Sequence, residues 1–411
     1  MVSSRACHYR LPCPVVNTEI PTELVREARR QLAHPQLAET LHRHLGELPR
    51  SVAADEIVTD LHPDCQMLSH SLRHLGNAGL SVTQYFTIAL QQFHAAEQII
   101  QRHPVERGEL KFLDFACGYG RLLNLLVHGL PRDNIQAAEI MPEAVHHVQQ
   151  RYGVQAWQST EAPEDFQPDQ RYDMIWVASL FSHLPEDLFV RWLRRLHDLL
   201  SDDGILCFTV HDEALLPPDM QLPDSGLLYI EGSENATLNP TIYGTSFVNE
   251  RFVHQALESA LGGHRPYRRF PRLIAFEQDV YMISRDGRQT PASMRGLRHG
   301  LRGWVDGCRT DADGVVHLHG WAASMDGDDI DCVEVMLDGQ TRFIRTGEPR
   351  PEVARVLGKP ELANCGWSCS MPLPIESTEA YLTVSARGWQ DPPALLYAAP
   401  ISTSARRDRA Y

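Results

Sequence analysis

The sequence places an acid and two glycines around one short turn, a combination suited to holding a small charged ligand. Residues 111–121 read KFLDFACGYGR, in which an apolar stretch reaches Asp114 and leads through Gly118 and Gly120 into a helical pattern. A glycine turn after a strand brings backbone N–H groups close to a ligand, because no side chain shields them. A second apolar stretch ends on Glu139, a carboxylate suited to ribose hydroxyls. The pattern predicts a nucleoside-containing cofactor.

The spacing of the glycines separates two classes of cofactor. A dinucleotide site needs a third glycine where the helix packs against the strand and the pyrophosphate, and Leu123 stands at that place. Asp114 would repel a phosphate, whereas it suits a positively charged or amino-bearing ligand. Both residues favour S-adenosylmethionine over NAD, so a nicotinamide oxidoreductase is disfavoured.

The turn resembles motif I of the class I S-adenosylmethionine-dependent methyltransferases, in which an acid is followed by alternating glycines. Ala116 replaces the first of those glycines, a departure that leaves less room for the methionine end of the cofactor. Residues 172–186 are similar to the family's fourth strand and the loop after it, and residues 199–211 to the turn and fifth strand. Residues 279–284 would be the last strand, which is antiparallel in this family.

Short apolar stretches alternate with helical ones through the middle of the chain, which predicts an α/β fold with a mostly parallel, Rossmann-like sheet covered by helices. The expected strands are 111–115, 135–139, 172–178 and 205–210, and the expected helices are 120–130, 142–151 and 186–200. Residues 211–250 break this alternation and are rich in Pro, Gly and Asn. A loop this long is usually functional, so we expect a lid on the substrate side.

A helical N-terminal region, residues 1–104, precedes the expected methyltransferase domain, residues 105–285. Residues 81–100 keep apolar positions at helical spacing and lead directly into the first strand. In the family that this chain resembles, such a helix often covers the cofactor. Tyr85 and Phe86 are therefore candidates for the pocket, with ordinary core packing as the alternative.

The pattern changes after residue 285. Residues 286–302 have linker composition, and residues 303–403 hold short alternating strands, two of them joined by the hairpin pair Asp338-Gly339. This predicts a separate all-β domain, most simply a sandwich. Its glycines and tryptophans are similar to those of small β-sandwich modules attached to bacterial surface-glycan and cell-envelope enzymes. Sugar binding, docking of a partner enzyme and stabilisation of the fold are its alternative roles.

The methyltransferase resemblance implies cofactor contacts at the tips of the strands. Glu139 would accept hydrogen bonds from both ribose hydroxyls, and Asp114 would face the methionine amino group or the backbone of the turn. Ser159 follows the third strand, where contact with adenine and a plain loop position are equal alternatives. The full expected set is Asp114, Ala116, Cys117, Gly118, Gly120, Glu139, Ile140, Ser159 and Ser179.

Two histidines follow strands at the edge where the acceptor would lie, and they are the candidates for a general base. Methyl transfer to a hydroxyl requires alignment of the oxygen and removal of its proton, and histidine accepts protons near neutral pH. His183 follows the fourth strand and His211 the fifth. The alternative role of His183 is to cap or pack against the start of the next helix, and that of His211 is a structural hydrogen bond to the lid. Asp212, Glu213 and Tyr243 are candidates for substrate contact, against ordinary loop or core positions.

Composition argues against nucleic-acid and metal partners and favours the cytoplasm. The net charge of −15, from 38 Lys and Arg against 53 Asp and Glu, makes a nucleic-acid backbone a poor partner. The paired histidines lack a convincing set of further ligands, so no metal site is expected. No signal-peptide core or membrane-length apolar window is found, and the nine cysteines are scattered without a Cys-x-x-Cys pair. A cytoplasmic protein with reduced thiols is expected.

We therefore expect an S-adenosylmethionine-dependent methyltransferase acting on a hydroxyl of a sugar, glycan or lipid-linked saccharide, an acceptor inferred from the company such β modules keep. A small secondary metabolite is the alternative acceptor. A further alternative is an inactive, methyltransferase-like scaffold or glycan-binding protein; Gly118, Gly120 and Glu139 argue against it, and Ala116 slightly favours it. A second copy of the chain or an enzyme of glycan biosynthesis is the expected protein partner.

Overall fold

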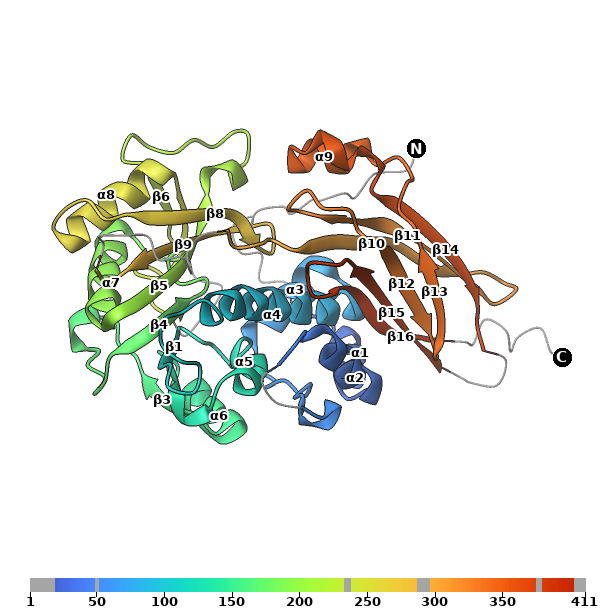
Figure 1. Ribbon diagram of the computed structural model, residues 1–411, viewed down its shortest axis with the longest axis horizontal. Helices are drawn as coiled ribbons and strands as arrows, with labels where there is room; N and C mark the ends of the chain where they lie inside the picture. The colour runs from blue at the N-terminus through green and yellow to red at the C-terminus, as the bar shows by residue number, and fades with distance from the viewer. Residues whose placement is uncertain (1–18, 49–51, 233–237, 287–295, 375–378, 403–411) are drawn as a thin grey trace.

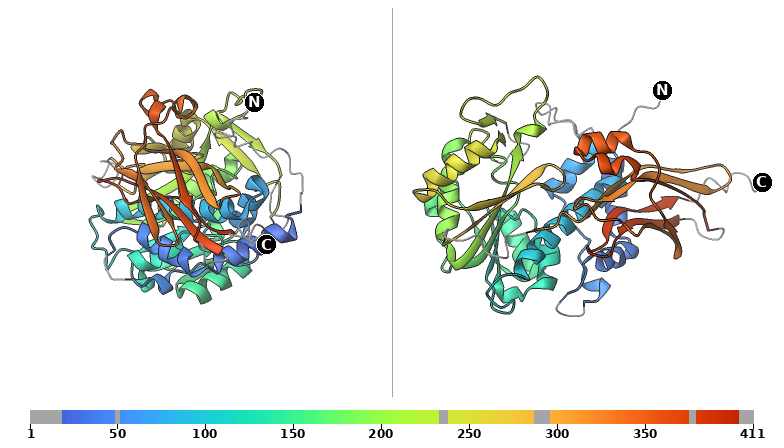
Figure 2. Two further views of the ribbon diagram at one scale, coloured as in Figure 1. Left: turned by 90° about the vertical axis from the view of Figure 1, so that its right-hand side faces the viewer. Right: turned by 45° about the horizontal axis from the view of Figure 1, so that its top comes forward.

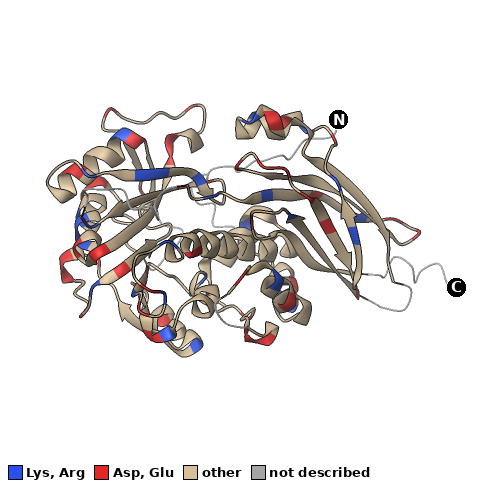
Figure 3. Ribbon diagram, viewed as in Figure 1, with Lys and Arg blue, Asp and Glu red and all other residues tan. Residues whose placement is uncertain are grey.

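The computed structural model describes residues 19–48, 52–232, 238–286, 296–374 and 379–402 (Figure 1). A helix-covered sheet forms one half and a β-sandwich the other, and a long helix lies between them in both Figure 1 and Figure 2. Lys and Arg are interspersed with Asp and Glu along both halves (Figure 3). No helix among the described residues combines the length and apolar character that crossing a bilayer would require.

The N-terminal region is helical, as expected. Its helices are α1 (Thr22–Leu32), α2 (Pro35–His44), α3 (Gln66–Leu75) and α4 (Ala78–Ile100). Gly76 ends α3 in the left-handed conformation, and the Asn77 side chain then caps α4 by accepting a hydrogen bond from the Leu80 N–H at 2.9 Å. This stop and start turns the chain sharply, so that α4 can run between the two halves of the molecule.

The larger sheet has the expected Rossmann-like topology. Its parallel strands are β1 (Phe112–Phe115), β2 (Ile135–Glu139), β3 (Gln155–Gln158), β4 (Tyr172–Val177) and β5 (Leu200–Asp212), in the order β3-β2-β1-β4-β5. β9 (Gln278–Ser284) runs antiparallel to β5, which confirms the antiparallel last strand. β8 (Tyr267–Ile274) pairs with β9 and was not expected, because its basic run resembles a solvated surface segment.

Helices cover both faces of this sheet. α4, α5 (Leu123–Gly129) and α6 (Pro142–Tyr152) share one hydrophobic core with it, and α7 (Glu186–Asp198) and α8 (Glu250–Leu261) share the other. α5 begins later than the expected residue 120, because Gly118 and Gly120 adopt positive φ angles of 56° and 85° that no helix contains. The glycine turn is thus longer than the pattern indicated.

The expected lid contains a short hairpin. β6 (Leu227–Ile230) pairs antiparallel with β7 (Thr245–Val248), and β7 extends the sheet alongside the tip of β5. Residues 233–237 of the expected lid lie outside the described residues. Strands this short carry little periodicity, so the sequence did not distinguish them from a loop.

The C-terminal half consists of two antiparallel sheets that share one core. β10 (Leu301–Thr310), β11 (Val315–Ser324) and β14 (Gly366–Pro372) form one; β12 (Cys332–Leu337), β13 (Gln340–Ile344), β15 (Glu379–Arg387) and β16 (Ala394–Ser402) form the other. α9 (Pro351–Leu357) precedes β14. Asp338 and Gly339 have φ angles of 45° and 81° and connect β12 to β13, which confirms the hairpin. The expected linker falls largely on residues 287–295, outside the described residues.

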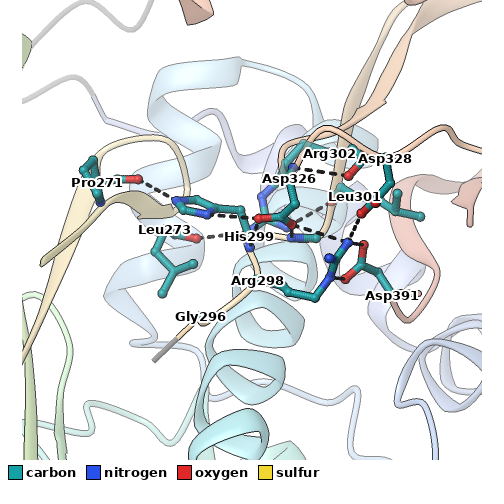
Figure 4. A network of polar contacts seen from close by, with 12 residues as sticks. Pro271, Leu273, Gly296, Arg298, His299, Leu301, Arg302, Asp326, Asp328 and Asp391 are labelled. Atoms are coloured by element: carbon teal, nitrogen blue, oxygen red, sulfur yellow. Dashed lines mark hydrogen bonds and ion pairs between the residues drawn. The ribbon is translucent and has the colours of Figure 1, made fainter. Parts of the chain in front are cut away.

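A network of charges fixes the start of the sandwich (Figure 4). The Arg298 guanidinium forms two hydrogen bonds with the Asp391 carboxylate, at 2.6 and 2.8 Å, and it also pairs with Asp328. Asp391 is nearly buried, so its charge needs this bidentate partner. The network joins the chain entering β10 to the loop between β15 and β16.

The same segment is bonded to the central half of the molecule. His299 Nε2 donates to the Pro271 carbonyl at 2.8 Å, and the buried Arg302 guanidinium donates to the Leu273 carbonyl at 3.0 Å (Figure 4). Both carbonyls belong to β8. Burial lowers the pKa of Arg302 to about 10, so the side chain remains charged at neutral pH. These bonds attach the sandwich to the sheet through one partly exposed donor, His299, and one buried donor, Arg302.

Candidate active site

A cavity opens at the carboxyl ends of β1, β2 and β4, where open α/β sheets bind their ligands. Together with the space at its mouth it measures about 1270 Å³. Eight of the nine residues expected to bind the cofactor line it: Asp114, Ala116, Cys117, Gly118, Glu139, Ile140, Ser159 and Ser179. The parallel sheet brings these residues together from four separate segments of the chain. Their contact with a cofactor stays a prediction.

The glycine turn has one open position and one closed position. A Cβ added to Gly118 would meet no atom within 4 Å, so the backbone there is open to a ligand. A Cβ on Gly120 would lie 2.4 Å from the Tyr152 ring of α6. The second glycine therefore permits helix packing. Ala116 has a φ of 57°, a conformation that costs roughly 1 kcal/mol for a residue with a side chain.

Glu139 connects the turn to the tip of β2. Its Oε2 accepts the Gly118 N–H at 2.8 Å, and its Oε1 accepts the N–H groups of Ile140 at 2.8 Å and Met141 at 3.2 Å. Burial raises the pKa of Glu139, while the three N–H donors favour its ionised form. The carboxylate is thus fixed between the glycine turn and the tip of β2, and its contact with a ribose stays a prediction.

Asp114 differs from Glu139, because one oxygen of its buried carboxyl accepts no hydrogen bond from the described residues. Its Oδ2 has no hydrogen-bond partner among the described residues, and the side chain is 3% exposed. Burial, together with the nearby Glu139 charge, raises the pKa of Asp114 to about 8, and Arg121 partly opposes the shift. A buried carboxyl without a donor fits a ligand that brings a positive charge, as S-adenosylmethionine does.

Helix α4 supplies the wall opposite the turn. Tyr85 and Gln92 line the cavity, and Gln92 Nε2 has no partner among the described residues. Tyr85 is also 1% exposed and part of the core, so both of its expected roles are found, whereas Phe86 lies in the core alone. The Arg121 guanidinium carbon lies 5.9 Å from the centre of the Tyr85 ring, within cation–π range.

The residues expected to contact the methyl acceptor fall into two groups, those at the cavity and those away from its lining. Tyr243 lines the cavity, and the His183 ring stacks on the Tyr243 ring with centroids 4.6 Å apart. His183 Nδ1 lies 2.6 Å from the Gly244 carbonyl oxygen, so Nδ1 carries the proton and Nε2 is the basic nitrogen. His183 does not itself line the cavity but lies against a residue that does.

His211, Asp212 and Glu213 lie away from the cavity lining. His211 pairs with β7 on one side and β9 on the other, and burial lowers its pKa to about 3. Asp212 accepts a hydrogen bond from Arg269 at 2.6 Å, and Glu213 begins an exposed 3-10 turn. None of the three points to acceptor contact in this conformation, and their roles stay predictions.

Comparison with known proteins agrees with this geometry. Residues 113–206 match a family described as a methyltransferase domain. This part of the chain is a methyltransferase domain. The match covers the glycine turn and all the strands whose tips form the cavity.

One curated relative is the N-terminal Xaa-Pro-Lys N-methyltransferase 1 of Danio rerio, 28% identical over 115 residues. The alignment covers 26% of this chain and 51% of the relative, so the chain spans about half the length of that protein. A solved 1,6-didemethyltoxoflavin-N1-methyltransferase from Burkholderia thailandensis is 18% identical with a TM-score of 0.33, and covers 46% of this chain and 77% of its own. An S-adenosylmethionine-dependent methyltransferase from Clostridium acetobutylicum is 12% identical with a TM-score of 0.34. The match covers 53% of this chain and 98% of the other protein.

The helix that covers the methyltransferase cavity also closes the edge of the β-sandwich. β16 is the outer strand of its sheet; its outer edge packs against α4, and Gln31 of α1 also reaches it. Thr83 Oγ1 accepts the Ala398 N–H at 3.0 Å and lies 3.2 Å from the Ala398 carbonyl, which Gln31 Nε2 also reaches. Thr87 Oγ1 donates to the Leu395 carbonyl at 3.1 Å. Side chains thus satisfy a strand edge that would otherwise be open.

Several residues of this site were missed at the sequence level. Cys65, Gln66 and Met67 line the cavity beside Gln92 and Arg121. Arg121 directly follows the second glycine, which is the one local signal that could have indicated it. The other four lie on or next to helices α3 and α4, and only the packing of those helices brings them to the cavity.

The raised pKa of Asp114 predicts a pH-dependent affinity for the cofactor. Below about pH 8 the carboxyl is mostly protonated, and a cationic ligand favours the ionised form, so binding releases a proton. We expect the affinity for S-adenosylmethionine to rise roughly twentyfold from about pH 6.5 to 8.5 and then to level off. Calorimetry in buffers of different ionisation enthalpy measures both the affinity and the released proton.

Two controls accompany this measurement. Asp114→Asn should bind more weakly at high pH and show a flat profile, and 5′-methylthioadenosine, which lacks the amino acid and the sulfonium, should bind without the dependence. An identical pH profile in the variant would show that Asp114 does not face the charged end of the cofactor.

The shared helix predicts that a change at the sandwich contact alters cofactor binding. Thr83→Val leaves the buried Ala398 N–H without its acceptor, so we expect the free energy of unfolding to fall by about 1–3 kcal/mol. The displacement of α4 should also weaken S-adenosylmethionine binding several-fold, because Tyr85 and Gln92 move with it. Denaturation and calorimetry check the two effects, and Thr83→Ser, which keeps the hydroxyl, is the matched control. Unaltered cofactor affinity in a destabilised Thr83→Val protein would refute the coupling.

Proposed function

We propose that the protein transfers the methyl group of S-adenosylmethionine to a hydroxyl of a sugar, glycan or lipid-linked saccharide. The observation that supports this acceptor is the wall formed by the lid, where the ring of Tyr243 and the amide of Asn239 line the same cavity as the cofactor residues. An aromatic face beside an amide suits a ring that is apolar on one face and carries hydroxyls at its rim. The choice also rests on the expectation, drawn from the sequence alone, that the sandwich resembles modules of surface-glycan enzymes.

His183 is the proposed general base. When bound, S-adenosylmethionine would supply an electrophilic methyl group bonded to its sulfonium sulfur. The sulfur would leave as a neutral thioether. His183 Nδ1–H is engaged by the Gly244 carbonyl, and the Gly244 N–H donates to the His183 carbonyl at 2.9 Å, so lid and histidine are fixed to each other. This fixes Nε2 as the atom that accepts the hydroxyl proton. The stacked Tyr243 ring orients the imidazole at the acceptor side.

A small-molecule acceptor is the second candidate, and the apolar character of the cavity favours it. The apolar lining residues include Leu180, Leu184, Leu188, Trp192, Leu238 and Ile242. Part of this wall suits the adenine ring, and the part contributed by the lid suits an apolar acceptor.

The acceptor is tested with purified full-length protein and a matched panel. Lipid-linked and free saccharides form one arm, and small phenols and heterocycles form the other. Formation of S-adenosylhomocysteine, with mass spectrometry of the methylated product, is expected in the saccharide arm. Turnover confined to the second arm would replace the proposed acceptor by the alternative. No measurable binding of S-adenosylmethionine, with no turnover on either arm, would favour the inactive scaffold or glycan-binding interpretation.

Removal of the proposed base should slow the transfer without weakening cofactor binding. We expect His183→Ala to lower the rate of hydroxyl methylation by about 10²–10⁴, the usual range for a general base, with an unchanged dissociation constant for S-adenosylmethionine. His183→Asn is the sharper variant, because its amide keeps a donor for the Gly244 carbonyl but cannot accept the proton. His146→Ala, an exposed histidine of α6, is the control. Full turnover by His183→Asn would exclude His183 as the base.

A further inference from the structure

We propose that His254, Glu258 and His264 form a binding site for a divalent transition-metal ion, with Zn²⁺ as the best fit. Their ligand atoms all lie within 4.8 Å of one another. His254 Nε2 is 3.4 Å and His264 Nδ1 4.0 Å from the same carboxylate oxygen of Glu258. The cluster lies at the C-terminal end of α8, on the side of the molecule away from the sandwich (Figure 1).

Local backbone structure brings the three side chains together. His254 and Glu258 are four residues apart on α8, so they lie on one face of the helix. The helix ends at Gly262, whose φ of 71° turns the chain back. The N–H groups of Gly262 and Gly263 both donate to the Glu258 carbonyl, at 3.0 and 3.1 Å. The turn that presents His264 is thus bonded to the residue that supplies the carboxylate.

The donor set selects the class of ion. Two imidazole nitrogens and one carboxylate oxygen suit Zn²⁺ and its neighbours, whereas Mg²⁺ and Ca²⁺ prefer oxygen ligands throughout. In a tetrahedral zinc complex, bonds of about 2.0–2.1 Å place the ligand atoms about 3.3 Å apart. Rotation of the side chains closes the difference from the observed spacing. The side chains are 36%, 42% and 67% exposed, so they can rotate and the ion can enter from solvent, which supplies the fourth ligand.

The ion would stabilise the methyltransferase half locally, at the end of α8. It would join the end of α8 to the turn that leads into β8, where the Tyr267 ring lies 6.1 Å from the His254 ring. α8 packs on α7, and Leu188 and Trp192 of α7 line the cavity. The three ligands themselves do not line it. The site therefore supports the wall of the cavity and takes no part in methyl transfer.

The test uses metal-stripped, full-length protein titrated with Co²⁺ and with Zn²⁺. We expect a visible Co²⁺ spectrum typical of tetrahedral coordination, displaced by Zn²⁺, and a higher melting temperature with either ion. His254→Ala and His264→Ala should each weaken binding roughly tenfold or more and abolish the tetrahedral spectrum. Glu258→Gln should weaken binding while keeping the helix.

Two controls make the result specific. His146→Ala removes an exposed helical histidine outside the cluster and should bind as the original protein does. His70→Ala removes one member of the stacked pair His70 and His74 on α3, which has the same helical spacing but no third ligand within the described residues. Retention of the spectrum and affinity in both cluster variants, or an equal loss in His70→Ala, would overturn the proposal.

Discussion

The outer edge of β16 is the constraint on which the arrangement of this protein depends. An edge strand exposes backbone groups that need partners, and here the hydroxyls of Thr83 and Thr87 and the amide of Gln31 provide them. The helix that closes the edge presents Tyr85 and Gln92 to the cofactor cavity. One hydrophobic core accordingly runs from the central sheet through α4 to the sandwich. The sandwich therefore belongs to the framework of the cavity, whatever else it binds.

Two buried carboxyls at neighbouring strand tips, Glu139 and Asp114, differ in their hydrogen bonding and in their charge. Glu139 has three N–H donors, so its position is fixed before any ligand binds. Asp114 has an oxygen without a partner among the described residues, and burial keeps it largely protonated at neutral pH. The first suits hydroxyl groups and the second a positive charge. The two carboxyls therefore offer a ligand two chemically different positions on one sheet edge.

The lid distinguishes the two histidines that the strand pattern had made equivalent. β7 pairs with the tip of β5, so His211 lies between β7 and β9, and burial lowers the pKa of His211. His183 instead is bonded to Gly244 of the lid and stacks on Tyr243, which reaches the cavity. The hydrogen bond to the lid, expected of His211, is thus made by His183, and it leaves Nε2 of His183 as the nitrogen without a proton.

The sequence by itself determined β1, β2, β4, β5 and β9 of the larger sheet, the glycine turn and the acid at the end of β2, because each is specified by residues close together in the chain. Only the tertiary structure decided that Gln92 and Arg121 face the cavity, that His211 is enclosed, and that Thr83 meets Ala398. These contacts join segments that no local periodicity relates. They depend on which helix face meets which strand edge, and that choice is made by the burial of apolar surface and the pairing of backbone groups across the whole chain.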